Sequence, residues 1–161
     1  SGTSKLEFKL ESLTQIAKES VDSLTQQAIE KKLNLVYHAN GNEIFWKISK
    51  DRITQVMINL LSNAIKYHDK PSGDINVHLS ADKEIAKIIV SDNGPGMEKA
   101  YYEKVFEKFY QIRKKDNIKE KGVGLGLAIT KSIVDKHNGE ITIESEPGSG
   151  TVISVHLPKI N

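Results

Sequence analysis

Residues 85–90 form a nearly continuous apolar run, and this run is the feature that most constrains the fold. A short apolar segment of this kind, followed by turn-forming residues, is typical of a central strand in a sheet. The turn-forming residues here are found at positions 92–96, in the sequence Asp-Asn-Gly-Pro-Gly. We therefore expect a fold organised around a sheet, with this turn at the end of a central strand.

Helical and extended patterns alternate along the rest of the chain. Apolar residues recur at helical spacing in residues 13–33, 50–67 and 125–137, and Ser12 followed by Gln15 predicts the start of the first helix. Further extended segments are predicted at residues 8–13, 33–39, 43–48, 75–79, 140–145 and 151–157. Because helices and strands are interspersed and several strand pairs are joined by short turns, we predict a mixed sheet with helices on one face. The predicted fold class is α/β (α+β), as a two-layer sandwich.

Composition limits the kinds of protein this chain can be. The chain has 161 residues, 38% of them hydrophobic, which is enough for one domain with its own core. A net charge of +2 gives little reason to expect nucleic-acid binding. No apolar run approaches the roughly 18 residues that a membrane helix needs, and the absence of cysteine excludes disulfides and thiolate zinc sites. We expect a single cytoplasmic domain with no nucleic acid and no direct membrane contact from this chain.

The helix predicted at residues 50–67 places polar side chains in a narrow stripe beside its apolar arc. With about 100° of rotation per residue, the apolar residues face the core. These residues are Ile53, Val56, Met57, Leu60, Leu61 and Ala64. The stripe consists of Arg52, Asn59, Asn63 and Lys66. Two amides and a lysine on one surface suit a Mg²⁺ ion and the phosphates it bridges, because Mg²⁺ prefers oxygen ligands. For the helix alone, the simpler interpretation is the solvent-exposed face of an amphipathic helix.

Two segments that contain glycine have the chemistry to contact a nucleotide. Asp92, held at the end of a buried strand, can accept a hydrogen bond from an adenine amino group, although these residue types also make ordinary turns. Residues 122–127, Gly-Val-Gly-Leu-Gly-Leu, precede a predicted helix, where backbone N–H groups and the helix dipole attract phosphate. The segment is neither a Walker loop nor a dinucleotide motif, and loop flexibility is its simpler interpretation.

A basic segment lies between these two glycine-containing segments. Residues 113–121 hold five lysines and arginines against one aspartate and one glutamate, a net charge of +3. The segment has almost no apolar residue to anchor it, whereas Phe106, Phe109 and Tyr110 before it predict an anchor in the core. We predict a mobile lid that folds over a triphosphate, with a solvated loop as the alternative.

Four segments in this order resemble the catalytic domain of histidine kinases in the GHKL superfamily. They are an asparagine box at residues 59–67, a first glycine box at 92–96, a phenylalanine box at 106–110 and a second glycine box at 122–127. The match extends from about residue 10 to residue 158, and the four boxes together are strong evidence. The resemblance implies an ATP-binding sandwich of about five strands and three helices, with an ATP lid at about residues 107–122.

The resemblance also implies roles for individual residues. Asp92 would bind the adenine amino group, and Asn59 and Asn63 would hold Mg²⁺ and phosphate, with Asn63 the first choice as metal ligand. Lys66 and Tyr67 would flank the phosphates and the ribose. Further nucleotide contacts would come from Gly94, Gly96, Lys108, Gly122, Gly124, Leu125 and Gly126. Transfer of the γ-phosphoryl group, with ADP as product, would depend on positioning and charge stabilisation by Asn59, Lys66 and Arg113.

Two departures from the family pattern concern the lid. Gln111 stands where many members carry an arginine, and the nearest arginine, Arg113, is two places further on. The sequence therefore does not decide which cation of the lid meets the γ-phosphate. Lys121 stands where a glycine often begins the second glycine box.

The chain is predicted to lack the histidine that accepts the phosphoryl group. None of its five histidines lies in the sequence context of a phosphoacceptor: they are His38, His68, His78, His137 and His156. Residues 1–9 are interpreted as the tail of a preceding dimerisation helix, a linker or a cloning remnant, and residues 10–161 as the catalytic domain. The implied partners are a histidine-bearing dimerisation domain of the same parent protein and the receiver domain of a response regulator.

Three other kinds of protein are alternatives to a histidine kinase. An ATPase of the same superfamily would carry a glutamate as general base where this chain has Asn59, and an amide cannot take a proton from water at neutral pH. A serine kinase that acts on a partner protein, as in anti-sigma factors, also uses this fold. A nucleotide-binding module without kinase activity is disfavoured because Asn63, Asp92 and the glycines of residues 122–127 are intact.

Overall fold

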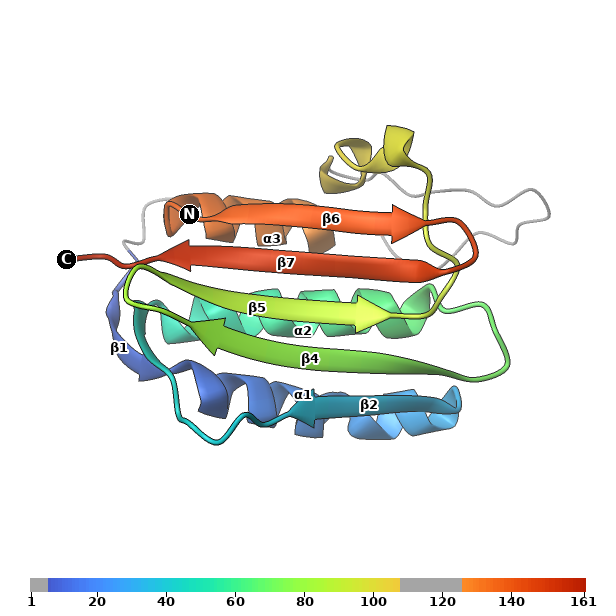
Figure 1. Cartoon of the computed structure of the whole chain (residues 1–161), viewed down its shortest axis with the longest axis horizontal. Coiled ribbons are helices and arrows are strands. Elements are labelled where there is room, and N and C mark those ends of the chain that lie inside the picture. The colour runs from blue at the N-terminus through green and yellow to red at the C-terminus, as the bar shows by residue number, and fades with distance from the viewer. Residues whose placement is uncertain (1–5, 108–125) are drawn as a thin grey trace.

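The computed structural model of the protein describes residues 6–107 and 126–161. Within these residues, three α-helices cover one face of a five-stranded sheet, and a second, two-stranded sheet lies at one end (Figure 1). The α-helices are α1 (Leu13–Glu30), α2 (Lys50–Lys66) and α3 (Gly126–Lys136), with short 3₁₀ helices at Lys99–Tyr101 and Lys104–Phe106. The strands are β1 (Lys9–Ser12), β2 (Leu33–His38), β3 (Phe45–Ile48), β4 (Gly73–Ala81), β5 (Ile85–Asp92), β6 (Glu140–Glu146) and β7 (Gly150–Pro158). The two-layer sandwich is confirmed.

Strand β5 lies in the middle of the five-stranded sheet, whose order is β2-β4-β5-β7-β6. β2 and β4 are parallel, and the other neighbouring pairs are antiparallel. The mixed sheet and the central position of the apolar run are therefore confirmed. The helices cover only one face of β5, where Ile88 and Val90 are buried, while Ile85 on the other face is 37% exposed. The apolar run thus reflects the central place of the strand and not burial on both sides.

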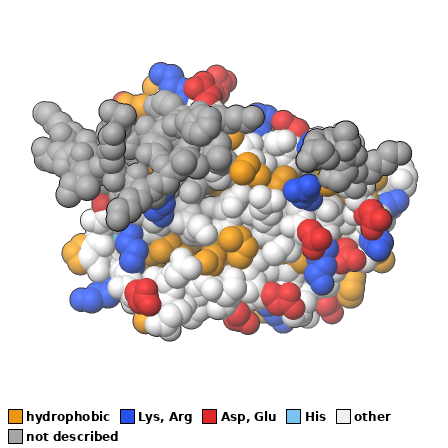
Figure 2. Space-filling view, turned by 180° about the vertical axis from the view of Figure 1, so that it is seen from behind, with side chains coloured by type: hydrophobic (Ala, Val, Ile, Leu, Met, Phe, Trp, Pro, Cys, Tyr) orange, Lys and Arg blue, Asp and Glu red, His pale blue; other side chains and the backbone are white. Residues whose placement is uncertain are grey.

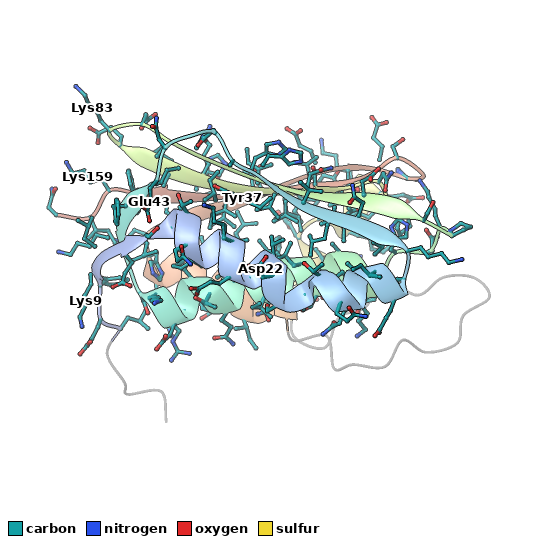
Figure 3. All side chains as sticks on the ribbon, turned by 90° about the horizontal axis from the view of Figure 1, so that it is seen from below. Lys9, Asp22, Tyr37, Glu43, Lys83 and Lys159 are labelled. Carbon is teal, nitrogen blue, oxygen red and sulfur yellow. The ribbon has the colours of Figure 1, made fainter. Side chains whose placement is uncertain are left out.

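Helix α2 forms the middle of the helical layer and carries much of the core. Figure 3 shows the sheet on one side and the helices packed beneath it. The predicted apolar arc is buried, except that Ala64 is only partly buried, and Ile65 completes the arc in its place. At the start of α1, the Ser12 hydroxyl accepts a hydrogen bond from the Gln15 N–H at 3.0 Å, as the sequence predicted.

The N-terminal part of the chain belongs to a separate small sheet. β1 pairs with β3 in antiparallel register, with Lys9 opposite Ile48 and Ser12 opposite Phe45. Both segments were predicted to be extended, but nothing in the sequence indicated that they pair with each other. Residues 6–8 lie in neither a helix nor a strand, and the assignment of residues 1–9 to a preceding helix or linker stays a prediction.

Charged side chains of both signs are interspersed over the helical face of the molecule (Figure 2). Exposed large hydrophobic residues in the described part of the chain are few, namely Leu10, Ile29, Phe45 and Ile85. No helix within residues 6–107 and 126–161 is long and apolar enough to cross a membrane.

A buried histidine joins the end of α3 to the start of α2. His137 is 1% exposed, its Nδ1 donates to the Ile133 carbonyl at 2.8 Å, and its Nε2 accepts from the Ser49 N–H at 3.1 Å. The Nε2 atom must be unprotonated to accept, so the ring is neutral in the folded state. Burial lowers the pKa of His137, and the hydrogen bond to Ile133 opposes that shift only in part.

Because His137 is neutral in the folded state, the protein is expected to lose stability in mild acid. A histidine in the unfolded chain has a pKa of about 6.5 and takes up a proton that the folded state excludes. We therefore expect the free energy of unfolding to decrease as the pH falls below about 6.5. Urea unfolding between pH 7.5 and 5.5 measures this. The slope should flatten in His137→Gln and persist in His78→Gln, because His78 is exposed on β4. An unchanged slope in His137→Gln would assign the effect to another group.

Candidate functional site

The asparagine stripe of α2 faces the start of α3. The Asn59 side-chain amide donates from Nδ2 to the Gly126 carbonyl at 3.2 Å. A Cβ atom added to Gly126 would lie 3.7 Å from Oδ1 of Asn63. The stripe predicted from helical periodicity is therefore not simply a solvent-exposed face, because it meets the glycine at which α3 begins. Of the second glycine box, Gly126 and Leu127 lie within the described part of the chain.

The hydrogen bond from Asn59 decides which of its atoms is free. Its Nδ2 is turned toward Gly126, so its Oδ1 is the atom left to act as a ligand. Together with the amide oxygen of Asn63, this makes a set of neutral oxygen donors next to a helix N-terminus. No cluster of three or more His, Cys, Asp or Glu side chains able to hold a metal occurs in the described residues. The donors present therefore fit Mg²⁺ only if phosphate oxygens complete its coordination.

The C-terminal end of α2 is held by a lysine that sequence reasoning missed. Lys31 Nζ donates to the carbonyls of Ile65 at 2.6 Å, Lys66 at 3.1 Å and His68 at 3.2 Å. A cation at the negative end of the helix dipole is favourable and satisfies carbonyls that have no partner within the helix. This contact orients the segment in which Lys66 Nζ lies 5.1 Å from the ring centroid of Tyr67. A lysine 34 residues before Ile65 leaves no local signal in the sequence of α2.

Asp92 ends β5 as a half-buried carboxylate. Its Oδ1 accepts a hydrogen bond from the Gly94 N–H at 2.9 Å. Burial raises the pKa of Asp92, while backbone N–H groups of Gly94 and Thr151 and the charges of His68 and Lys70 oppose the rise. A carboxylate that is partly desolvated and held by the backbone is a strong acceptor for a ligand N–H group. The position predicted for adenine binding therefore has the chemistry that this role needs.

The glycines after Asp92 allow the backbone to pack closely. A Cβ on Gly94 would lie 3.0 Å from Asp92 Oδ1, so this residue gives the carboxylate its space. Gly96 has φ +67°, and its Cβ would lie 1.9 Å from the Glu146 carbonyl oxygen. The absence of a side chain at Gly96 therefore lets this loop pack against the end of β6. The expectation that Gly96 also leaves space for the adenine base stays a prediction.

The turn between β6 and β7 supports the Asp92 loop. The sequence predicted this turn only as the connection of a hairpin. The Gly148 N–H donates to the Pro95 carbonyl at 2.7 Å, and the Met97 N–H donates to Ser145 Oγ at 2.8 Å. Ser145 Oγ in turn donates to the Gly150 carbonyl at 2.8 Å. The only sequence signal was the density of glycine and proline in residues 146–150.

The structure brings the predicted residues into two groups. Asn59, Asn63 and Gly126 form the first group. Asp92 and Gly94 form the second, and the loop after α2, which begins with Tyr67, connects it to the first. Lys66, Tyr67 and Gly96 are described but belong to neither group. The other predicted contacts lie outside the described residues, and they are Lys108, Arg113, Gly122, Gly124 and Leu125.

Comparison with known proteins decides the family. Residues 48–161 match the family of histidine kinase-, DNA gyrase B- and HSP90-like ATPases. The chain belongs to this family. Among its relatives in the histidine kinase-like ATPases, sensor histidine kinase WalK of Bacillus subtilis is 37% identical over 132 residues, which are 80% of this chain and 21% of WalK. The chain thus spans about a fifth of the length of that relative.

Solved structures place the chain with the kinase branch of the histidine kinase-like ATPases. The catalytic domain of histidine kinase ThkA matches with a TM-score of 0.81 and 26% identity, covering 95% of this chain and 98% of that domain. ThkA in complex with the response regulator TrrA matches with a TM-score of 0.77 and 24% identity, covering 95% of this chain and 42% of the kinase chain. The chain is an ATP-binding catalytic domain of the histidine kinase type, as its four boxes predicted.

Proposed function

We propose that this domain binds Mg-ATP and transfers the γ-phosphoryl group to a histidine nitrogen on a separate dimerisation domain. The phosphoryl group then passes to an aspartate of a response regulator. The observation that carries the proposal is the pairing of the two groups described above. A partly desolvated carboxylate acceptor at Asp92 suits the adenine amino group. The oxygens of Asn59 and Asn63 beside the start of α3 suit the metal-bound phosphates.

In this proposal the chain acts by holding the nucleotide in place. Asp92 accepts from the adenine amino group, which fixes one end of ATP. The positive end of α3 at Gly126 attracts the phosphates, while Asn63 and Asn59 would hold Mg²⁺, which neutralises phosphate charge. Lys66 adds a cation close to Tyr67, on the side of the ribose and phosphates. Phosphoryl transfer needs little more than such positioning and charge stabilisation.

Two observations favour transfer to a protein over hydrolysis of ATP. Asn59 donates its amide to Gly126, and an amide has no basic site to activate water. The acceptor histidine comes from another domain in this proposal, since His68 and His137 are buried and the other three histidines, His38, His78 and His156, lie on strands of the sheet. WalK is named a sensor histidine kinase, and ThkA is solved with a response regulator, which supports a response regulator as partner.

Transfer of label from γ-labelled ATP tests the proposal. The chain is mixed with Mg²⁺, labelled ATP and the helical dimerisation domain from the same parent gene. We expect label on that domain that is lost in acid and kept in base, as a phosphohistidine is. Asn63→Ala should lose at least about a hundredfold of the labelling rate, because the metal loses an oxygen ligand and the phosphates lose an amide N–H donor. Ser80→Ala, on the exposed face of β4, serves as the control. Nucleotide binding without any labelled histidine would sink the proposed kinase activity.

A further inference from the structure

The loop between α2 and β4, residues 67–72, contacts both groups of site residues. It begins at the helix that carries the asparagines, where Lys31 holds the last carbonyls of α2. It is followed by Gly73, the first residue of β4, which lies beside the turn that follows Asp92. Two side chains of this loop, His68 and Lys70, reach the Asp92 turn. None of the four sequence boxes contains either residue, and sequence reasoning gave neither a role in the site.

Lys70 joins the Asp92 turn to the turn between β6 and β7. Its Nζ donates to the Asn93 carbonyl at 2.7 Å and to the Gly148 carbonyl at 3.0 Å. Asn93 follows Asp92 directly, and its own Oδ1 accepts from the Asp74 N–H at 2.9 Å. One ammonium group therefore ties together three segments that are distant in sequence. Hydrogen bonds from a charged donor are stronger than those between neutral groups.

His68 fills the space beneath this connection. Its side chain is 6% exposed, and its Nε2 donates to the Ser72 carbonyl at 2.8 Å. The ring fits because two neighbours are glycines: a Cβ on Gly73 would lie 2.3 Å from Cε1, and a Cβ on Gly94 would lie 3.3 Å from Nδ1. No hydrogen-bond partner among the described residues reaches the buried Nδ1. The ring thus packs against the same glycine whose N–H holds the Asp92 carboxylate.

The charges around Asp92 give Lys70 a second effect. The carboxylate lies in a partly desolvated position, and burial is the main cause that raises the pKa of Asp92. The N–H groups of Gly94 and Thr151 act against this rise, and the electrostatic effects of His68 and Lys70 act in the same direction. An ionised Asp92 is the form that accepts from adenine. The ammonium of Lys70 therefore favours the binding form as well as the position of the turn.

We propose that Lys70 is a positioning residue for the nucleotide, whose ammonium holds the Asp92 turn so that the carboxylate meets the adenine amino group. The inference rests on the adenine role of Asp92 in the proposed function. It concerns ATP binding and not the phosphoryl-transfer step. Lys70 does not touch the nucleotide in this proposal, because its hydrogen bonds go to the carbonyls of Asn93 and Gly148.

Calorimetric titration of ATP into the whole chain tests this. Lys70→Met should weaken ATP binding about fivefold at neutral pH, an effect scaled to charged hydrogen bonds at an exposed position. Lys70→Arg should stay within about twofold of the original affinity, since a guanidinium also donates to two acceptors. Lys83→Met is the matched control. Lys83 lies on the turn between β4 and β5, at the opposite end of the sheet from Asp92 (Figures 1 and 3).

A pH series tests the effect of the Lys70 charge on Asp92 separately from its hold on the turn. ATP binding by the original chain should weaken as the pH falls and Asp92 takes up a proton. Without the charge of Lys70, that loss should begin at a higher pH, whereas Lys70→Arg should keep the original profile. Weakening that is equal at every pH would support the hold on the turn and would overturn the effect of the Lys70 charge on Asp92.

The remaining outcomes distinguish this inference from the proposed function. If the original chain binds ATP and Lys70→Met binds it with unchanged affinity at every pH, the inference is wrong and the proposed function stands. If the original chain binds no nucleotide, both fall together. The maximal rate of labelling should change less than the ATP concentration needed for half that rate, because the transfer step does not involve Lys70.

Discussion

Asp92→Asn is expected to weaken ATP binding by about a hundredfold while the fold stays intact. The carboxylate accepts a hydrogen bond from the adenine amino group in the proposed complex. An asparagine loses the charge and can turn its own amino group toward that donor. Loss of a hydrogen bond to a charged group costs about 1.5 to 3 kcal/mol, and the mismatched amide adds to this. Titration with ATP, or competition with a fluorescent analogue, measures the affinity.

The same substitution should not destabilise the chain. Because burial raises the pKa of Asp92, the ionised carboxylate is less favourable in the folded than in the unfolded chain. This unfavourable contribution is present above the pKa of the folded state, so removing the charge should leave the free energy of unfolding at pH 7 unchanged or slightly higher. Urea unfolding measures it. A loss of ATP binding together with a loss of stability would point to a damaged fold.

Asp82 offers a matched control at the other end of the sheet. Its carboxylate also accepts backbone hydrogen bonds, from the N–H groups of Glu84 and Ile85 at 2.8 Å each. These hydrogen bonds lower the pKa of Asp82, the opposite direction from Asp92. Asp82→Asn should therefore bind ATP normally and lose a little stability at neutral pH. Wild-type affinity in Asp92→Asn would remove the adenine assignment.

Local patterns in the sequence were sufficient for most of the fold. Helical periodicity predicted α2 to within a residue, since burial of one face repeats every three to four residues. The apolar run predicted the central strand β5 for a similar reason. The pairing of β1 with β3 was not predictable in the same way, because each strand has four residues and little pattern of its own.

The sequence predicted candidate site residues but not the contacts that support them. Asn59, Asn63 and Asp92 were predicted from their amide and carboxylate oxygens together with the resemblance of their boxes to the family, and their roles stay predictions. Lys31 and Lys70 were missed because each binds backbone carbonyls far along the chain, and any exposed lysine looks the same in sequence. Ser145 was missed for the same reason. A contact between a side chain and a distant stretch of backbone produces neither a periodic pattern nor a characteristic local composition in the sequence, so it cannot be predicted from either.

Gly150→Ala is expected to be among the most damaging single changes in the described residues. Gly150 has φ +112°, and a Cβ there would lie 2.0 Å from the carbonyl oxygen of Asp92. The clash involves backbone on both sides, so no side-chain rotation relieves it. We expect a loss of about 3 kcal/mol or more in the free energy of unfolding, measured by urea denaturation.

Gly148→Ala in the same turn separates backbone strain from the clash. Gly148 also has a positive φ, +83°, but a Cβ there would meet nothing within 4 Å. Its cost should be about 1 kcal/mol, the usual penalty for a side chain in this conformation. A similar cost for both variants would contradict the close approach of β7 to Asp92.

The two glycine variants should also differ in ATP binding. In Gly150→Ala the displaced backbone is that of Asp92 itself, so any folded molecules should bind ATP at least about tenfold more weakly, measured under conditions that keep the variant folded. Gly148→Ala keeps the Gly148 N–H that donates to Pro95 and should bind normally. Loss of affinity only at position 150 would show that the turn between β6 and β7 acts on the site through the Asp92 backbone. Normal binding by folded Gly150→Ala would limit that turn to a role in stability.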